Sequence, residues 1–299
     1  MKPEIARYLW ELLWQEYSSR VSYARIYQEM ITAAGGTIAN DHIALRSLRL
    51  HIDSPQGQVK LGIEYLDAIA HFLGYSAQGE YFFPDTHLYA RHYRHPQQAE
   101  WDLPKLFISE LIVEELPQRT QELIKSTVSS FTPTHLPRTD TSTPVEISRQ
   151  LQPIFKRPWR APRHSVVEEV NTITQYGAWV LLHGYAVNHF TGYVNHQQTS
   201  QYPDIEATVS GLGKLGIPMK EKIEGSETVG LRQTATHAVT EMVTVLDDAT
   251  GKEKQIPWTY AYYEIAQRYM VKTETGKEEL FDGFLGRSAQ QLFEMTRMV

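Results

Sequence analysis

The amino-acid sequence predicts an α+β fold in which one structural unit occurs twice. The chain begins with helices, because Ile5, Leu9, Leu12 and Leu13 recur at the spacing of one helix face. A strand, a helix and several further strands then follow one another in each half of the chain. A stretch of different composition separates the halves. These observations predict a single domain over residues 1–299, with N-terminal helices, a duplicated core and a central insertion.

The composition is that of an ordinary globular protein and excludes several kinds of site. The 299 residues carry a net charge of -6, so the basic face typical of nucleic-acid binding is not expected. Cysteine is absent, which excludes disulfides and cysteine nucleophiles and leaves His, Asp and Glu to hold any metal. The sequence has no apolar signal core at its start and no apolar run of membrane-spanning length. We therefore expect a cytoplasmic protein without nucleic-acid or membrane partners.

The first part of the chain predicts two helices followed by the first repeated unit. Residues 1–36 form the helical segment, and the Gly35-Gly36 pair ends its second helix. Residues 37–113 form the first βαβββ-like unit. Its expected elements are a strand from residue 40, a helix at 61–73 and strands at 79–83, 87–93 and 105–113.

The central and C-terminal parts predict an insertion and the second unit. Residues 114–176 are expected to form a helix and long loops, because Thr, Ser and Pro dominate 126–144 and prolines interrupt a basic stretch at 156–163. We interpret the basic stretch as a solvated loop. Residues 177–270 form the second βαβββ-like unit and 271–299 a C-terminal segment. The expected elements are a strand at 185–194, a helix at 205–215 and strands at 220–223, 228–234, 238–246 and 259–269.

Two histidines occupy equivalent places in the repeated units. Side chains alternate along a strand, so His42 and Arg46 share one face, and apolar residues take the other. His189 follows an asparagine in the first strand of the second unit, where the first unit has His42. A duplicated fold would bring the two imidazoles together across a pseudo-two-fold axis.

Glu264 adds a carboxylate to this pair of histidines. Its predicted strand face also carries Tyr260, Tyr262, Ala266 and Arg268. A carboxylate among aromatic rings is costly to bury unless a cation accompanies it. One interpretation is a salt bridge between Glu264 and Arg268. The other is a metal site of His42, His189 and Glu264, which the equivalent positions of the histidines favour.

These motifs resemble a known family. The His-x-x-x-Arg strand at 42–46, the Asn-His-Phe-Thr strand at 188–191 and the glutamate of the aromatic strand are similar to those of the 2-oxoadipate dioxygenase/decarboxylase family, also called 2-hydroxyglutarate synthases. The resemblance spans about residues 9–293 and includes the motifs at 231–234, 282–284 and 288–289. The family's fold is similar to that of the vicinal oxygen chelate enzymes, in which paired βαβββ units form a half-open barrel around one Fe(II).

The resemblance implies a role for each candidate residue. His42, His189 and Glu264 would bind Fe(II), and Arg46 would serve catalysis by binding a substrate carboxylate. The implied reaction consumes O2 and a 2-oxo acid, converting 2-oxoadipate to 2-hydroxyglutarate and CO2. Further candidates for substrate binding are Gln233, Arg268 and Ser288.

Two other functions remain open from the residues. Vicinal oxygen chelate scaffolds host several chemistries, so a metal-binding isomerase, lyase or non-catalytic protein of the same fold is an alternative. A structural or interaction protein, in which His42 and Glu264 are satisfied polar core groups, is the other. Metal analysis followed by oxygen uptake with 2-oxo acids would separate the three.

Overall fold

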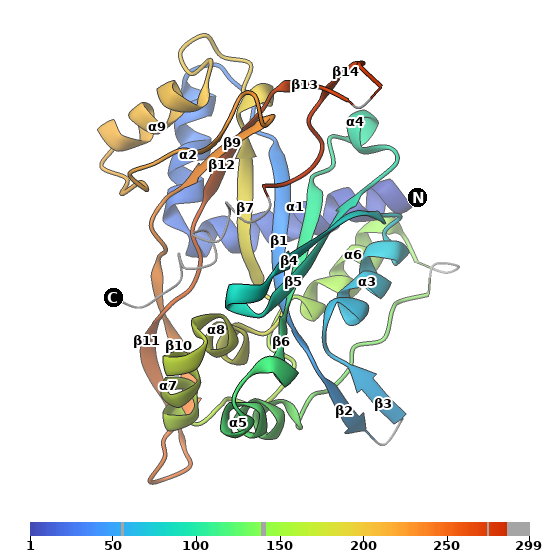
Figure 1. The fold of residues 1–299 in the computed structure, drawn as a ribbon, viewed down its shortest axis with the longest axis vertical. Helices are drawn as coiled ribbons and strands as arrows, with labels where there is room; N and C mark the ends of the chain where they lie inside the picture. The colour runs from blue at the N-terminus through green and yellow to red at the C-terminus, as the bar shows by residue number, and fades with distance from the viewer. Residues whose placement is uncertain (55–56, 139–141, 274, 286–299) are drawn as a thin grey trace.

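The computed structural model describes residues 1–54, 57–138, 142–273 and 275–285, and it is built around one mixed sheet of eight strands. The strand order is β4-β5-β6-β1-β7-β12-β9-β8, and the sheet curls into a half-barrel (Figure 1). Each half of the chain supplies one contiguous half of the sheet. This arrangement differs from a doubly wound parallel sheet, because neighbouring strands run antiparallel at several positions.

The first half of the sheet is a complete βαβββ unit. Strand β1 is parallel to β6, and β5 is antiparallel to both β4 and β6. Helix α3 has one buried face, which includes Leu66 and Ile69, and it connects β1 to β4. The elements are β1 (Asn40–Arg49), α3 (Ile63–Phe72), β4 (Ser76–Phe83), β5 (Leu88–Arg94) and β6 (Lys105–Ile112).

The second half of the sheet repeats this topology. Strand β7 is parallel to β12, and β9 is antiparallel to both β12 and β8. A hairpin of β10 (Thr240–Leu246) and β11 (Glu253–Thr259) is inserted between β9 and β12 and forms its own two-stranded sheet. The repeated elements are β7 (Val187–Tyr193), α9 (Ile205–Lys214), β8 (Glu224–Ser226), β9 (Leu231–Ala235) and β12 (Glu264–Arg268).

Two strands predicted in this half differ from the structure. Residues 220–223 form no strand, and the short β8 follows them instead. The strand expected at 259–269 is shorter, because Tyr260–Tyr263 lie outside any strand and lead from the hairpin back to the sheet. Hydrogen bonds to side chains and to loop backbone hold this segment, as when Trp179 donates to the carbonyl of Tyr260. The largely aromatic residues 260–263 therefore have a strand-like sequence, although side-chain and loop contacts, and not strand pairing, hold them in place.

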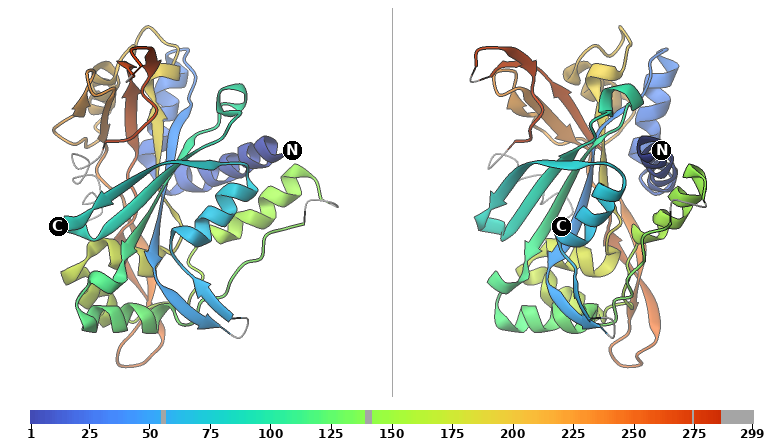
Figure 2. Two further views of the ribbon diagram at one scale, coloured as in Figure 1. Left: turned by 45° about the vertical axis from the view of Figure 1, so that its right-hand side comes forward. Right: turned by 90° about the vertical axis from the view of Figure 1, so that its right-hand side faces the viewer.

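Helices cover the outer face of the sheet. The N-terminal helices α1 (Lys2–Arg20) and α2 (Ser22–Ala33) lie behind β1 and β7 in the view of Figure 1, and Figure 2 shows the sheet curling away from them. On α1, Trp14 and Tyr17 pack on Phe190 of β7, with ring centroids 5.2 and 5.1 Å apart. Because Phe190 faces the helices, the neighbouring His189 is directed to the inside of the half-barrel.

The insertion between the halves is more helical than the sequence predicts. Pro144 begins one of its helices, where Thr143 and Glu146 form a capping box that satisfies backbone donors. Among the described residues, the helices of this region are α5 (Gln118–Val128), α6 (Pro144–Leu151), α7 (His164–Ile173) and α8 (Gln175–His183). Helix α8 closes one end of the half-barrel and is buried from Tyr176 to His183.

The remaining elements are short and peripheral. They are β2 (His51–Ser54), β3 (Gly57–Lys60), α4 (Gln98–Trp101), β13 (Met270–Lys272) and β14 (Glu278–Leu280). Strands β2 and β3 pair with each other, as do β13 and β14. No helix in the described part of the chain has both the length and the apolar character to cross a membrane.

Candidate metal centre

The junction of the two units places the histidines symmetrically. Strands β1 and β7 pair antiparallel, with Ile43 opposite Phe190. On one side of this pair His42 lies opposite Thr191, and on the other His189 lies opposite Ala44. Such a register is what a pseudo-two-fold axis between Ile43 and Phe190 requires. The axis relates His42 to His189, as their positions in the two units predict.

A β-bulge precedes each histidine. On β1 the pairing moves from Asn40 to His42 while its partner strand advances by one residue, so Asp41 is the extra residue. On β7 the extra residue is Asn188 by the same count. A bulge redirects the side chain of the extra residue. Each histidine therefore has a hydrogen-bond acceptor beside it that strict strand alternation would place on the opposite face.

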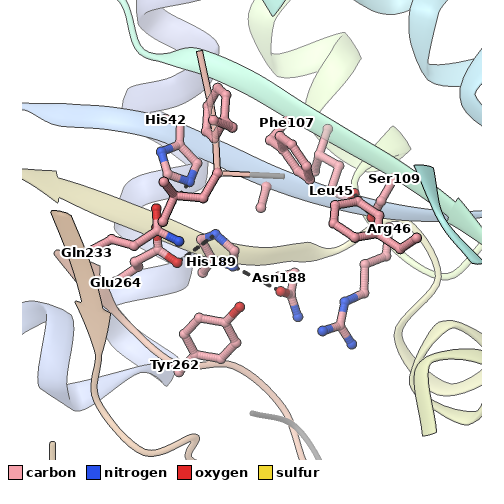
Figure 3. Close-up of a pocket in the computed structure, with 14 residues that line it drawn as sticks. His42, Leu45, Arg46, Phe107, Ser109, Asn188, His189, Gln233, Tyr262 and Glu264 are labelled. Carbon is pink, nitrogen blue, oxygen red and sulfur yellow. Dashed lines mark hydrogen bonds and ion pairs between the residues drawn. The ribbon is translucent and has the colours of Figure 1, made fainter. Parts of the chain in front are cut away.

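These acceptors orient the imidazoles. Asp41 Oδ1 lies 2.8 Å from His42 Nδ1, and Asn188 Oδ1 lies 3.0 Å from His189 Nδ1. If each Nδ1 carries the proton, each Nε2 presents a lone pair. Both Nε2 atoms are directed toward Glu264 (Figure 3). A hydrogen bond on the distal nitrogen is the usual support of a metal-binding histidine.

Glu264 completes a group of three candidate metal ligands. Strand β7 lies between β1 and β12, and its Thr191 pairs with His42 on one side and with Glu264 on the other. Glu264 and His42 are therefore level with each other across the sheet. Its carboxylate oxygens are 3.4 Å from His42 Nε2 and 3.7 Å from His189 Nε2. One ligand atom from each residue lies within 4.8 Å of the other two, and all three residues are buried. Two histidines and one carboxylate form a facial triad, the donor set of non-haem Fe(II) oxygenases.

The electrostatics of these three residues fit a divalent cation. Burial lowers the pKa of His42, although the hydrogen bond that Nδ1 donates to Asp41 opposes this, and burial lowers the pKa of His189 well below its usual value. Burial also raises the pKa of the Glu264 carboxyl well above its usual value. Within the described residues no lysine or arginine forms an ion pair with Glu264. Neutral imidazoles beside a buried carboxylate are the ligands that a divalent metal ion stabilises.

The duplicated site offers three candidate metal ligands because the fourth place is apolar. Ala44 and Thr191 are equivalent, since each lies two residues after its histidine. Thr191 is paired with Glu264 on β12, and Ala44 is paired with Phe107 on β6. Phe107 therefore occupies the place in the first unit that Glu264 has in the second. A metal held by three ligands on one side keeps coordination positions for other molecules.

One cavity contains the three ligands together with Arg46. Arg46 is 2 % exposed, and its guanidinium carbon lies 4.8 Å from the Tyr176 ring centroid and 5.0 Å from that of Trp179. Figure 3 shows Arg46 at the other end of the cavity from Glu264. The lining consists of His42, Ala44, Leu45, Arg46, Phe83, Phe107, Ser109, Asn188, His189, Gln233, Tyr262, Glu264, Phe284 and Leu285.

The other predicted substrate-binding residues lie in different places. Gln233 lines the cavity, is 3 % exposed and has no hydrogen-bond partner for its Oε1 among the described residues. Arg268 is buried but does not line this cavity, and its partner is Asp41 instead of Glu264. Ser288 lies outside the described residues.

A short C-terminal segment forms one wall of the cavity. We call residues 281–285 the strap. The Phe284 ring lies edge-on to His42, with centroids 4.8 Å apart, and 4.9 Å from that of Phe107. The strap is fastened by the Arg268 guanidinium, which donates to two of its carbonyl oxygens, and by the backbone N–H of Phe284, which donates to the Tyr81 hydroxyl. An apolar wall thus lies directly against a metal-ligand candidate.

Sequence reasoning missed several residues that shape the site. They include the acceptors Asp41 and Asn188, and Tyr262, whose ring stacks on His189 at 4.8 Å. A signal for the acceptors was present, because both histidines directly follow a residue with a side-chain oxygen. Alternation assigned Asp41 to the opposite strand face, and the bulge that overturns this is invisible in a single sequence. The sequence indicates Phe284 only as part of the motif at 282–284 and assigns it no role in the site.

Comparison with known proteins finds one and the same family by a family model and by individual relatives. The family model described as 2-oxoadipate dioxygenase/decarboxylase matches residues 13–298. The chain is 26% identical to the chloroplastic/amyloplastic 2-oxoadipate dioxygenase/decarboxylase of Oryza sativa subsp. japonica, over 94% of this chain and 75% of the relative. It is 27% identical to the chloroplastic 2-oxoadipate dioxygenase/decarboxylase of Arabidopsis thaliana, over 86% of this chain and 67% of the relative.

Solved structures show the same fold. A protein assigned to the glyoxalase superfamily from Ralstonia eutropha JMP134 superimposes with a TM-score of 0.80 at 25% identity, covering 94% of this chain and 86% of that one. The hydroxyglutarate synthase of Oryza sativa, in complex with 2-oxoadipate, gives 0.78 at 23% identity, covering 99% and 93%. The predicted α+β fold, with paired βαβββ units in a half-open barrel like that of the vicinal oxygen chelate proteins, is confirmed.

Proposed function

The chain belongs to the 2-oxoadipate dioxygenase/decarboxylase family, and from this premise we propose that it is an Fe(II)-dependent enzyme acting on a 2-oxo diacid. The proposed reaction converts 2-oxoadipate and O2 to 2-hydroxyglutarate and CO2, which balances carbon and oxygen. The observation that carries the proposal is the shared cavity, in which a buried His-His-Glu group and a buried arginine lie at opposite ends. The curated relatives named for this activity support it.

The three ligands hold the metal and fix its position. His42 and His189 contribute Nε2, and Glu264 contributes a carboxylate oxygen. Asp41 and Asn188 keep the imidazoles in the tautomer that binds metal, through their bonds to Nδ1. When bound, Fe(II) supplies the activation of O2 and a binding site for a 2-oxo acid group.

Arg46 binds the second carboxylate of the substrate. A diacid with one end at the metal has a second negative charge that must be neutralised inside a buried cavity, where an unpaired charge costs several kcal/mol. Arg46 is buried and lies across the cavity from Glu264. A guanidinium can bind both oxygens of a carboxylate at once, so it fixes the orientation of the acid as well as its charge.

Apolar residues keep water from the reacting groups. Phe284 of the strap contacts both His42 and Phe107 of β6, and Tyr262 stacks on His189. Excluding water strengthens the electrostatic contacts inside the cavity and limits side reactions of a reactive oxidant. Gln233, which lines the cavity, and Ser288 stay as proposed substrate-binding residues of lower rank than Arg46. Arg268 is bound to Asp41 and the strap outside the cavity, so we do not propose it as a direct substrate contact.

A metal-dependent isomerase, lyase or non-catalytic role is the alternative, because two histidines and a glutamate also bind zinc in other enzymes. The deciding experiment is metal analysis of the purified protein, followed by oxygen uptake of the Fe(II)-loaded protein with 2-oxoadipate, 2-oxoglutarate and 2-oxohexanoate. We expect oxygen uptake with equimolar CO2 and 2-hydroxyglutarate from 2-oxoadipate. Bound metal without oxygen uptake would favour the alternative, and absence of metal binding would favour a structural role.

The proposed compartment is a reducing one such as the cytoplasm. Its support is the absence of cysteine, which makes the fold independent of disulfides. The two curated plant relatives have names that place them in plastids. Fractionation of cells that contain the protein, with immunodetection, tests this proposal.

A further inference from the structure

Asn188 has a buried amide nitrogen that donates to none of the described residues. Its side chain lines the cavity and is 2 % exposed. Oδ1 is bonded to His189, whereas Nδ2 has no hydrogen-bond partner among the described residues. Leaving a buried donor without an acceptor is destabilising, because the group has lost its hydrogen bonds to water. A donor retained at that cost, in a cavity wall, indicates a partner that enters from the cavity.

The chemistry of His189 fixes which end of the amide faces the cavity. A histidine that binds metal through Nε2 carries its proton on Nδ1 and needs an acceptor there. Asn188 can meet that need only with its oxygen, so its NH2 group must point the other way. The β-bulge at Asn188 turns the side chain toward the inside of the half-barrel. In Figure 3 Asn188 lies between His189 and Arg46.

We propose that Asn188 is a specificity-determining residue whose amide donates a hydrogen bond to the substrate carboxylate bound by Arg46. The inference rests on the proposed function, since it assumes a diacid in the cavity. A guanidinium on one side and a neutral NH2 group on another would surround the carboxylate with donors. The neutral NH2 group adds a directional hydrogen bond without adding charge. It therefore favours substrates whose carboxylate lies at this position in the cavity.

The equivalent residue of the first unit shows why an asparagine matters here. Asp41 makes the same bond to His42, so a carboxylate is sufficient to orient a histidine in this fold. Its charge is neutralised by Arg268, away from the cavity. An aspartate at position 188 would instead present its charge toward Arg46 and the substrate. Histidine orientation alone permits either residue at this place, whereas the proposed substrate contact requires the amide.

The test is therefore Asn188→Asp, which keeps the acceptor for His189 and replaces the donor. Bound iron is measured, and anaerobic titration calorimetry gives the dissociation constants of 2-oxoadipate and of 2-oxohexanoate, which lacks the second carboxylate. We expect wild-type iron content, binding of 2-oxoadipate weakened at least 100-fold, and binding of 2-oxohexanoate changed less than fivefold. Binding of both acids within twofold of wild type would overturn the proposal.

Two further variants make the result specific. Asn171→Asp makes the same change on helix α7, away from the cavity, and should leave both dissociation constants unchanged. If Asn188→Asp does not fold, Asn188→Ala removes the donor without adding charge, and we expect about tenfold weaker binding of 2-oxoadipate. Equal weakening for both acids would overturn the proposal.

Binding is measured without turnover. A wild-type protein that binds 2-oxoadipate but consumes no oxygen would therefore contradict the proposed reaction and leave this test intact. A wild-type protein that does not bind 2-oxoadipate would overturn both.

Discussion

Arg268 donates two hydrogen bonds to Asp41, 2.5 and 2.8 Å long, in a buried ion pair. The same guanidinium donates to the carbonyl oxygens of Phe281 and Gly283 in the strap, at 2.9 and 2.8 Å. Asp41 in turn accepts from His42. One side chain thus connects a metal-ligand candidate to the wall that closes the cavity. The pair also holds the pKa of Asp41 well below its usual range in spite of burial, chiefly through the charge of Arg268.

Replacing Arg268 by alanine is expected to loosen both the fold and the metal site. The variant leaves a buried carboxylate without its cation, which costs about 3–5 kcal/mol. We expect urea unfolding to show a loss of free energy of that order. Competition with a chelator should show weaker iron binding, because His42 loses a firmly held acceptor.

The matched control is Arg7→Ala. Arg7 faces Glu11 at 3.7 Å in an exposed pair, and such pairs contribute at most about 1 kcal/mol. Its iron affinity should equal that of wild type. An Arg268→Ala protein as stable as the Arg7 variant, with unchanged iron affinity, would contradict a role for Arg268 in fixing the site.

The duplicated fold was predictable because periodicity and order of elements survive in one sequence. Helical spacing and glycine stops predicted α3 and α9, and the two histidines marked equivalent strands. The inserted hairpin of β10 and β11 hid the true relation between the units, since β10 was predicted as a member of the main sheet and β11 was not predicted. Only the pairing of β12 with β7 and β9 shows that the hairpin lies apart.

The site was predictable as a set of ligand types but not as a geometry. His42, His189 and Glu264 come together as expected, because strand order decides that. Arg268 shares a strand with Glu264, and face alternation suggested that it would share the cavity. The structure directs it to Asp41 and the strap, since the bulge turns Asp41 toward it. A bulge depends on how two strands that are distant in the sequence pair with each other. That pairing cannot be predicted from a single sequence.

Loss of any one metal ligand should remove most of the bound iron. His42→Ala, His189→Ala and Glu264→Ala each leave two ligands, too few to hold Fe(II) in a facial triad. Elemental analysis of proteins purified in parallel measures this, with His71→Ala as an exposed control that should retain wild-type iron. Full iron in all three variants would show that the metal, if any, binds elsewhere.

His183 should make the protein less stable in mild acid. Burial, and next the charge of Arg20, lower its pKa from 6.5 to about 3. Its Nδ1 lies 3.6 Å from Glu241, but that carboxylate is bound by Arg20 at 2.7 Å. The unfolded chain takes up a proton below pH 6.5 and the folded chain does not until about pH 3. The free energy of unfolding therefore falls as the pH drops through this window.

The measurement for His183 is urea unfolding at pH 7.5 and 5. Wild type should lose about 2 kcal/mol more stability over this interval than His183→Gln, which has no imidazole to protonate. Other groups titrate in both proteins and cancel in the difference. Equal losses in the two proteins would mean that His183 is protonated in the folded state.

Arg46 provides the sharpest test of the substrate class. Arg46→Ala should keep its iron, because Arg46 is on β1 but outside the ligand group, and should raise KM for 2-oxoadipate about 100-fold or more. Arg46→Lys should recover only part of the binding, since an ammonium cannot copy the two parallel bonds of a guanidinium. With 2-oxohexanoate, which has no second carboxylate, the same variants should differ little from wild type.

The alternative for Arg46 is a structural role, in which its guanidinium mainly stabilises the contacts with the rings of Tyr176 and Trp179. That role predicts a lower free energy of unfolding and equal losses with both acids. A folded, iron-loaded Arg46→Ala protein that turns over 2-oxoadipate like wild type would exclude Arg46 as the carboxylate-binding residue.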